Sequence, residues 1–223
     1  MSDEPIIMTI AVLGGTGKEG SGLALRWALN GYRVIIGSRD AERATAKANE
    51  LNDQVGETYI TGMANTDAAK AANLVVLSVP YSAHRATLES VKPHLTGKIL
   101  IDVTVPLAPP NVASVHLPEG QAAGLEAQAL LGDEVKVVSA FQNVTSTKLK
   151  KPDMEVNCDV LICGDDADAK AEVVKLVEAA GMRGIDAGSL RNAIAIESMT
   201  PVLLYINKSY KVKGAGIRIT NLD

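Results

Sequence analysis

The chain has 223 residues, 47% of them hydrophobic, and its 22 Lys and Arg residues against 26 Asp and Glu residues give a formal net charge of -4. Such a chain is long and apolar enough to bury a substantial core, and it carries no whole-protein basic footprint for nucleic acid or an anionic membrane. The first residues, MSDEP, lack the positive region of a signal peptide, and no apolar run approaches the roughly 20 residues of a membrane helix, so we expect a cytoplasmic globular protein with neither nucleic acid nor membrane as a partner.

Short apolar runs and helical patterns alternate along the chain. Runs rich in Val, Ile and Leu, each short enough for a buried strand, lie at 6–13, 33–37, 74–79, 98–103, 135–139 and 156–162. Helical patterns lie at Ser21–Asn30, Ala41–Asn52, Asp67–Ala72, Ser82–Val91, Glu126–Leu131, Ala167–Ala180 and about Arg191–Lys208. Strands that alternate with helices indicate βαβ units, so we predict an α/β protein with a doubly wound parallel sheet and right-handed crossovers.

Three stretches fall outside this alternation. Pro106–Gly120 contains four prolines, and we expect a long surface loop there. From Phe141 to Met154 the sequence turns polar and rich in Lys, which we interpret as a junction, while Arg183–Gly188 is poor in apolar residues. We therefore predict a nucleotide-binding domain over residues 1–140 and a smaller C-terminal domain over residues 141–223.

The most informative local motif is the glycine-rich stretch AVLGGTGKEGSG at residues 11–22. Within it, Gly15–Gly20 fits G-x-G-x-x-G, follows one predicted strand and opens a predicted helix, after which a second strand follows. Glycine permits a tight turn and close approach of the backbone to a pyrophosphate, and the helix N-terminus offers free N–H groups and a partial positive charge. The pattern favours a dinucleotide phosphate-binding turn over an ordinary strand-to-helix turn.

The end of the predicted strand 33–37 bears on which dinucleotide binds. An NAD-specific protein usually places Asp or Glu here for the ribose hydroxyls, whereas this chain continues with Ser38, Arg39 and Asp40. Arg39 offers a planar, permanently charged group to a 2′-phosphate, Ser38 a hydroxyl, and Arg43 lies one helical turn beyond. These residues favour NADP(H). The alternative is that the arginines only form a solvated helix start, while Asp40 takes the ribose or caps the helix.

Cysteine and histidine give no sign of a metal site. Cys158 and Cys163 lie in an apolar run whose spacing matches neither a disulfide framework nor a zinc site, and we expect two buried small side chains. His84 is expected to be exposed in the first turn of its helix, with contact to a cofactor as the alternative. His94 and His116 have no nearby cluster of ligands, so we predict no metal.

The charged residues of the C-terminal half can each be explained by a structural role. Asp165, Asp166 and Asp168 are best placed to cap the following helix rather than to hold a cation. Glu197 precedes Pro201, which should kink or break the last helix, and a packing or interface role for Glu197 is at least as plausible as a functional one. Basic residues near the C-terminus usually form a solvated face; they are Lys208, Lys211, Lys213 and Arg218.

Six blocks of the sequence, in order, carry a family resemblance over nearly the whole chain: GGTGKEGSGLALRWALNGYRVIIGSRD, LSVPYSAH, VVSAFQNV, CGDDADAKAEVVKLVEAAGMRGIDAGSL, ESMTPVLL and GAGIRI. With them the chain resembles the NADPH-dependent coenzyme F420 reductases, also called F420H2:NADP oxidoreductases. The resemblance implies an oxidoreductase that passes a hydride between NADP(H) and the deazaflavin F420. It also implies a Rossmann domain followed by a small C-terminal domain that contributes to the F420 site. The apolar helix around Pro201–Ile206 either forms a homodimer interface or covers the sheet, and we expect a homodimer.

The resemblance also assigns residues. It places the NADP pyrophosphate at Gly15, Thr16, Gly17, Lys18 and Glu19, the 2′-phosphate at Ser38, Arg39 and Arg43, and the nicotinamide half at Val79, Pro80, Tyr81 and Val105. It places the deazaflavin at the stretch 140–146, with Gln142 and Asn143 as substrate contacts and Ser146 as a further cofactor contact. Some members of the family carry a His where this chain has Gln142, which bears on the polar contacts of the pocket. Basic residues of the C-terminal segment are candidates to attract the acidic tail of F420.

The chemistry requires no catalytic acid or base for the hydride step, because the cofactors supply the electronics. We therefore assign no catalytic side chain, and water, Gln142, Asn143 or a backbone N–H is available to assist the proton that a reduced deazaflavin takes up. Two other functions stay open at this point. One is an NADPH-dependent reductase of another small acceptor, such as an imine, a flavin or a chelated metal. The other is a non-enzymatic NADP(H) sensor.

Overall fold

The structure is a computed structural model that describes residues 8–222; MSDEP and the first two residues of the predicted strand 6–13 lie outside it. Its strands are β1 (Thr9–Leu13), β2 (Arg33–Ser38), β3 (Ile60–Ala64), β4 (Leu74–Leu77), β5 (Ile99–Asp102), β6 (Lys136–Ser139), β7 (Asp159–Gly164) and β8 (Arg183–Asp186). Its α-helices are α1 (Lys18–Leu29), α2 (Ala41–Val55), α3 (Asn65–Ala71), α4 (Tyr81–Val91), α5 (Ala123–Leu131), α6 (Ser146–Leu149), α7 (Ala167–Ala179) and α8 (Ala193–Ser209), with short 3-10 helices at Lys92–His94 and Leu190–Asn192.

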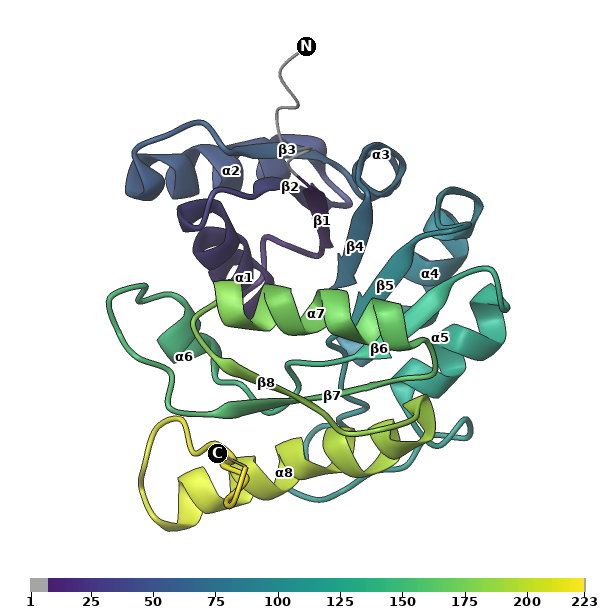
Figure 1. Ribbon diagram of the computed structural model, residues 1–223, viewed down its shortest axis with the longest axis vertical. Coiled ribbons are helices and arrows are strands. Elements are labelled where there is room, and N and C mark those ends of the chain that lie inside the picture. Colours follow the sequence, from purple (N-terminus) through teal and green to yellow (C-terminus); the bar gives the residue numbers. More distant parts are fainter. Residues whose placement is uncertain (1–7, 223) are drawn as a thin grey trace.

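The strands form one sheet in the order β3-β2-β1-β4-β5-β6-β7-β8 (Figure 1). Neighbouring strands are parallel except β6 and β7, which run antiparallel. The register pairs Leu13 with Gly37 and with Leu77, Leu77 with Asp102, and Asp102 with Ser139. The carboxyl ends of β1, β2, β4, β5 and β6 therefore lie along one edge of the sheet, where ligands bind in doubly wound folds.

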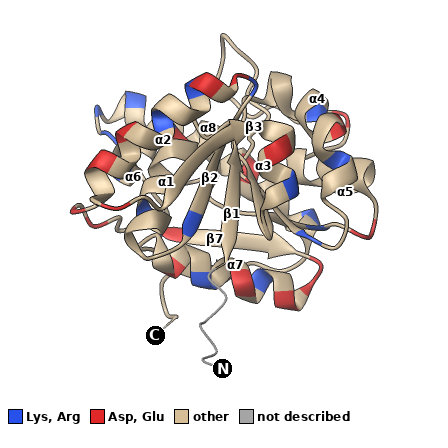
Figure 2. Ribbon diagram, turned by 90° about the horizontal axis from the view of Figure 1, so that it is seen from above, with Lys and Arg blue, Asp and Glu red and all other residues tan. Residues whose placement is uncertain are grey.

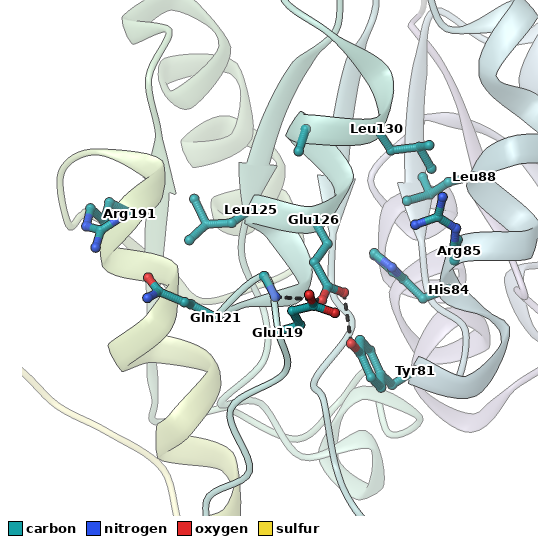
Figure 3. Close-up of a pocket in the computed structure, with 12 residues that line it drawn as sticks. Tyr81, His84, Arg85, Leu88, Glu119, Gln121, Leu125, Glu126, Leu130 and Arg191 are labelled. Atoms are coloured by element: carbon teal, nitrogen blue, oxygen red, sulfur yellow. Dashed lines mark hydrogen bonds between the residues drawn. The ribbon is translucent and has the colours of Figure 1, made fainter.

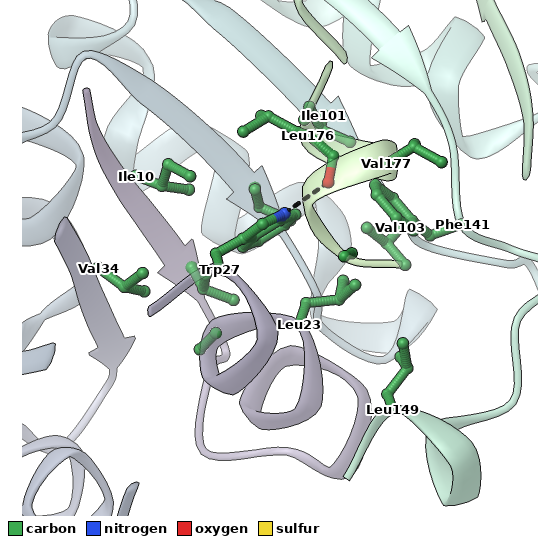
Figure 4. Packing of buried hydrophobic residues seen from close by; sticks show 14 of the residues in the cluster. Ile10, Leu23, Trp27, Val34, Ile101, Val103, Phe141, Leu149, Leu176 and Val177 are labelled. Carbon is green, nitrogen blue, oxygen red and sulfur yellow. Dashed lines mark hydrogen bonds between the residues drawn. The ribbon is translucent and has the colours of Figure 1, made fainter. Parts of the chain in front are cut away.

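Helices cover both faces of the sheet and create two apolar clusters. One cluster joins the sheet to α1, α2 and α7, and the other joins it to α3, α4 and α5. At the centre of the first, Trp27 is fully buried; its Nε1–H donates to the carbonyl of Leu176 at 2.8 Å, and its ring meets Phe141 edge-on, with ring centroids 5.9 Å apart (Figure 4). This packing joins residues on both sides of the predicted domain boundary.

Arg26 makes a second connection across that boundary. Its side chain is only 6% exposed, and burial lowers its pKa. The guanidinium donates from Nη1 to the carbonyl of Ala180 at 2.9 Å and from Nε to the carbonyl of Leu149 at 3.1 Å. Nη2 lies 2.9–3.1 Å from the carbonyls of Lys148, Lys151 and Met154. Five backbone carbonyls from the α6 region and the end of α7 thus surround one cation of α1.

The predicted alternation of strands and helices agrees with the structure, and the exceptions have physical causes. β3 and β8 are the two edge strands of the sheet and are mostly half-exposed, so they lack the apolar run that marks a buried strand. The four-residue helix α6 is too short to show a helical period. α1 begins at Lys18 rather than Ser21. α8 continues through Pro201, so of the predicted kink or break the break does not occur.

Charged residues lie mainly on the outer helices and loops, with Lys and Arg interspersed among Asp and Glu (Figure 2). The strands at the centre of the sheet carry few of them, as expected for strands covered on both faces. Among residues 8–222, no helix combines the length and the apolar character needed to span a bilayer.

Candidate active site

The turn after β1 has the geometry that a phosphate-binding loop requires. Gly14 has φ +73°, and a Cβ there would lie 2.4 Å from the carbonyl of Ser78. Gly15 N–H donates to the carbonyls of Val12 and Gly37, which folds the turn against β1 and β2. α1 then begins with Gly17 as its N-cap, and no side chain in the described part of the chain caps it. The first N–H groups of α1 and the positive end of its dipole are therefore available to an anion.

The end of β2 lies beside this turn because Leu13 and Gly37 are paired. Asp40 caps α2, where its Oδ1 accepts hydrogen bonds from the N–H groups of Glu42 and Arg43 at 3.0 and 3.2 Å, as one of the sequence alternatives predicted. Its carboxylate is thus engaged in the protein. Arg39 and Arg43 are exposed and form no ion pair with any residue that the structure describes.

A cavity of about 580 Å³ opens at the carboxyl edge of the sheet. It brings together ten of the residues predicted from the sequence, namely Gly17, Lys18, Glu19, Val79, Pro80, Tyr81, Val105, Gln142, Asn143 and Ser146. Gly15, Thr16, Ser38, Arg39 and Arg43 do not line it; they lie on the turn itself and along the end of β2 and the start of α2.

Sequence reasoning missed the part of the cavity wall that comes from the loop after β5 and from α8. These residues include Thr104, Leu107, Pro109, Val112, Thr200, Leu203, Leu204 and Asn207. The predicted loop Pro106–Gly120 is indeed irregular and exposed at Pro109–Asn111, but Leu107, Pro109 and Val112 of its first half also line the cavity. The prolines that made it recognisable as a loop gave no sign of this, whereas the position of Thr104 just beyond a strand end was a usable signal.

A residue with a strained backbone, Phe141, immediately precedes two polar residues of the cavity, Gln142 and Asn143. Phe141, the second residue after β6, is fully buried and has φ +75°, a conformation that is rare for a bulky side chain. The turn that it makes is followed directly by Gln142 and Asn143, which are 4% and 3% exposed and line the cavity. The edge-on contact between Phe141 and Trp27 helps to hold this conformation.

Three buried polar atoms at the cavity wall have no hydrogen-bond partner among the described residues: Thr104 Oγ1, Gln142 Oε1 and Asn143 Oδ1. Leaving such an atom unpaired costs about 1–3 kcal/mol, so native structures normally satisfy it. All three belong to residues that line the same cavity. The arrangement fits a ligand that brings complementary polar groups to this wall.

Two carboxyl groups near the site have strongly raised pKa values. Burial raises the pKa of Glu19, at the head of α1, to about 8. Burial also raises the pKa of Glu197 to about 7, although this carboxyl accepts hydrogen bonds from the N–H groups of Ala123 and Gly124. Both groups therefore change charge in the physiological pH range.

His84 is not exposed, so that prediction was wrong. It is 2% exposed, and its Nε2 lies 2.6 Å from Oδ2 of Asp102, which is fully buried. Burial opposes the charged imidazolium, but the hydrogen bond and charge of Asp102 outweigh it, and the pKa of His84 is raised. His84 contacts the last residue of β5 instead of solvent, which the sequence pattern alone did not reveal.

A second cavity, of about 860 Å³, lies between α4 and α5 (Figure 3). Tyr81 lines both cavities, and its hydroxyl donates to Glu126 at 2.8 Å. Burial and this bond raise the pKa of Tyr81 to about 12. The hydrogen bond to Glu126 thus fixes the Tyr81 side chain at the boundary between the two cavities.

The remaining candidates have structural roles. Cys158 and Cys163 are free and buried, as predicted. Asp166 caps α7 through the N–H of Ala169, also as predicted, whereas Asp165 accepts instead from the N–H of Leu190. Within residues 8–222, no group of three or more His, Cys, Asp or Glu side chains is arranged to hold a metal ion.

Comparisons with known proteins agree on one family. Residues 9–106 match the family model described as NADP oxidoreductase, coenzyme F420-dependent. An F420-dependent NADP reductase of Methanocaldococcus jannaschii is 45% identical over 97% of this chain and 100% of its own length. One of Methanothermobacter thermautotrophicus is 42% identical over 97% of both chains.

The fold of this chain also matches that of a solved structure. A crystal structure from Arthrobacter sp. FB24, assigned to the F420-dependent NADP reductases, superposes with a TM-score of 0.79 at 29% identity and covers 96% of this chain and 100% of that chain. The Rossmann-type fold predicted from the sequence is thereby confirmed. Because the identity and coverage of the relatives are both high, the chain belongs to the family of F420-dependent NADP reductases.

Proposed function

We propose that this protein is an oxidoreductase that transfers a hydride between NADP(H) and coenzyme F420. The observation that carries the proposal is that one cavity is lined both by the uncapped start of α1 and by Thr104, Gln142 and Asn143, each of which has a buried side-chain oxygen without a partner among the described residues. In this proposal residues 1–140 bind NADP(H), and residues 141–223 complete the F420 pocket. Family membership and the fold support it.

The residues present fit both coenzymes. The free N–H groups of α1 suit the pyrophosphate, and Ser38, Arg39 and Arg43 suit the 2′-phosphate because Asp40 is already used as a helix cap. The apolar side chains of Val79, Val105 and other residues of the cavity suit planar rings, and the unpaired atoms suit the polar edges of those rings.

Bound together, the two coenzymes supply the hydride donor and acceptor carbons. The protein therefore has to bind the rings, orient them and exclude water. The loop after β5 and the α8 residues Thr200 and Leu203 line the same cavity as the start of α1. Because the coenzymes supply the reacting carbons and the protein only binds and orients them, we assign no acid or base to the hydride step.

Mixing the purified protein with NADPH and F420 tests the proposal. The visible absorbance of the oxidised deazaflavin should fall as NADPH is consumed, with one equivalent of each used. Parallel reactions with a cyclic imine, free flavin and a ferric chelate should be far slower. NADPH oxidation by one of those acceptors without F420 reduction would contradict the proposal and favour a different reductase, and the absence of turnover with every acceptor would favour a sensor.

Glu19 should make NADPH binding depend on pH. Because burial raises its pKa to about 8, Glu19 is protonated at neutral pH and can donate to a phosphate oxygen, whereas above pH 8 it becomes an anion beside the pyrophosphate. We expect the Kd for NADPH to rise above pH 8, by up to about tenfold per pH unit, the limit for one titrating group. Isothermal titration between pH 7 and 9.5 measures it.

A Glu19→Gln variant should remove that dependence, since the amide keeps the shape and cannot ionise. Glu178→Gln, an exposed change on α7, is the matched control and should behave as wild type. If Glu19→Gln loses affinity above pH 8 as steeply as the wild-type chain does, Glu19 is not the group responsible.

A further inference from the structure

A buried chain of hydrogen bonds runs from α8 to the cavity, and it begins at Glu197. This side chain is 2% exposed, and its carboxylate accepts from the N–H groups of Ala123 and Gly124 at 2.7 and 3.0 Å. It thereby caps α5, whose own N-cap residue Ala122 supplies no capping side chain. Its Oε1 also lies 3.4 Å from the hydroxyl of Ser139, the last residue of β6.

The chemistry of these groups fixes the direction of each hydrogen bond. An ionised carboxylate only accepts, so the Ser139 hydroxyl donates to Glu197 and keeps its lone pairs for another donor. That donor is Nε2 of Gln142, at 2.8 Å. The other hydrogen of Nε2 goes to the backbone carbonyl of Asp102, also at 2.8 Å, which can only accept.

Rotation of the Gln142 side-chain amide would consequently cost free energy, because hydrogen bonds would be lost. Both of its hydrogens are used inside the protein, and a rotation of 180° would set Oε1 against the carbonyl of Asp102. The backbone is held as well, because Thr200 Oγ1 donates to the Gln142 carbonyl at 2.7 Å. Oε1 is left as a fixed acceptor without a partner among the described residues, in a side chain that lines the cavity.

Asn143 repeats the arrangement through different partners. Its Nδ2 donates to the carbonyl of Asp159 at 2.6 Å and approaches Sγ of Cys158 at 3.2 Å, while Oδ1 is unpaired within residues 8–222. Gln142 and Asn143 both line the cavity, and each keeps one buried side-chain oxygen that can only accept and has no partner among the described residues. A ligand satisfies them with N–H or O–H groups.

We propose that Glu197 is a positioning residue that acts through Ser139 to hold Gln142 Oε1 as a hydrogen-bond acceptor, so that the pocket selects a ring with an N–H donor, as in the imide of a deazaflavin pyrimidine ring. The identity of that ring rests on the proposed function. The fixed orientation of the Gln142 amide is independent of the proposed function, because it follows from contacts within the protein alone. Removal of Ser139, or of the Glu197 that orients its hydroxyl, weakens one of the two contacts that hold the amide and leaves the carbonyl of Asp102 as the other.

Binding titrations at pH 8, above the pKa of about 7 of Glu197, test the proposal. The variants are Glu197→Gln, Ser139→Ala and the double variant, with Glu178→Gln as the exposed control. We expect the Kd for F420 to rise about tenfold in each single variant, the size of one lost hydrogen bond, and the Kd for NADPH to change by less than about twofold. The double variant should be no worse than either single variant, since both act through the same amide.

A general loss of structure would raise both Kd values together, so that result would overturn the proposal, as would a wild-type Kd for F420 in both single variants. Ser139→Ala is the smaller change and keeps the test valid if Glu197→Gln does not fold.

A second measurement does not depend on F420. The side-chain amide of Gln142, observed by 15N NMR, should exchange its hydrogens slowly with water in the wild-type chain and faster in Ser139→Ala. Equal rates of amide hydrogen exchange in the two proteins would contradict the proposal that the Gln142 amide is held in one orientation. If the wild-type chain fails to bind F420 while this difference is seen, the proposed function fails and the positioning of Gln142 by Ser139 stands.

Discussion

An Arg39→Asp variant is expected to bind NADPH on the order of a hundredfold more weakly than the wild-type chain, while its affinity for NADH changes little. A hydrogen bond to a charged group contributes about 1.5–3 kcal/mol, and the new carboxylate adds repulsion to the loss. Arg39 is exposed at the carboxyl end of β2, without an ion pair to any described residue. Its removal should therefore act on the ligand and not on the fold. Fluorescence titration with each nucleotide measures the two affinities.

Arg33 provides the matched control because it is exposed on the same strand but at the opposite end. Arg33→Asp changes the net charge by the same amount, so it separates a local contact with the 2′-phosphate from general electrostatic attraction. If Arg39→Asp weakens NADPH and NADH binding equally, or if Arg33→Asp matches its effect, Arg39 does not recognise the 2′-phosphate.

Replacing Arg26 with Met is expected to lower the free energy of unfolding by about 3–5 kcal/mol, because several buried carbonyls lose their donor at once. For a chain of this size that corresponds to a fall in Tm of roughly 6–20 °C. Arg26→Lys should recover little, since one ammonium group cannot reproduce the planar set of donors that meets five carbonyls. Thermal unfolding followed by circular dichroism measures the difference.

The exposed Arg33 again serves as the control, and Arg33→Met should leave Tm nearly unchanged. A small Tm change in Arg26→Met, similar to that of Arg33→Met, would mean that water replaces the guanidinium without cost. In that case Arg26 would not be what joins α1 to the α6 region and the end of α7.

The sequence was most informative where one residue type has one physical reason to be present. The glycines of the turn, the apolar runs of the buried strands and Asp40 as a helix cap could each be predicted locally, and the structure confirms the elements that they indicated. The family resemblance is also confirmed, because it rested on blocks spread over the whole chain. Edge strands β3 and β8 were missed because exposure removes the apolar pattern on which strand prediction depends.

The candidate site was predictable to a smaller extent. Residues that follow strand ends could be placed at the cavity because strand ends meet at one edge, which applies to Val79 and Gln142. The exposure of His84 was predicted wrongly and the role of Glu197 was left open, because burial and partners far along the chain decide both. The partner of His84 lies 18 residues away and that of Glu197 lies 74 residues away. No local pattern carries that information.

We propose that one cavity brings the two coenzyme rings together, so that the hydride passes directly between them. NADPH deuterated at both C4 positions, mixed with F420 and the wild-type protein, tests it in a single turnover. We predict that mass spectrometry will find one deuterium atom bound to carbon in the reduced deazaflavin and none released to water. Reduced F420 without deuterium, with the label found in the solvent, would contradict direct transfer between the two rings.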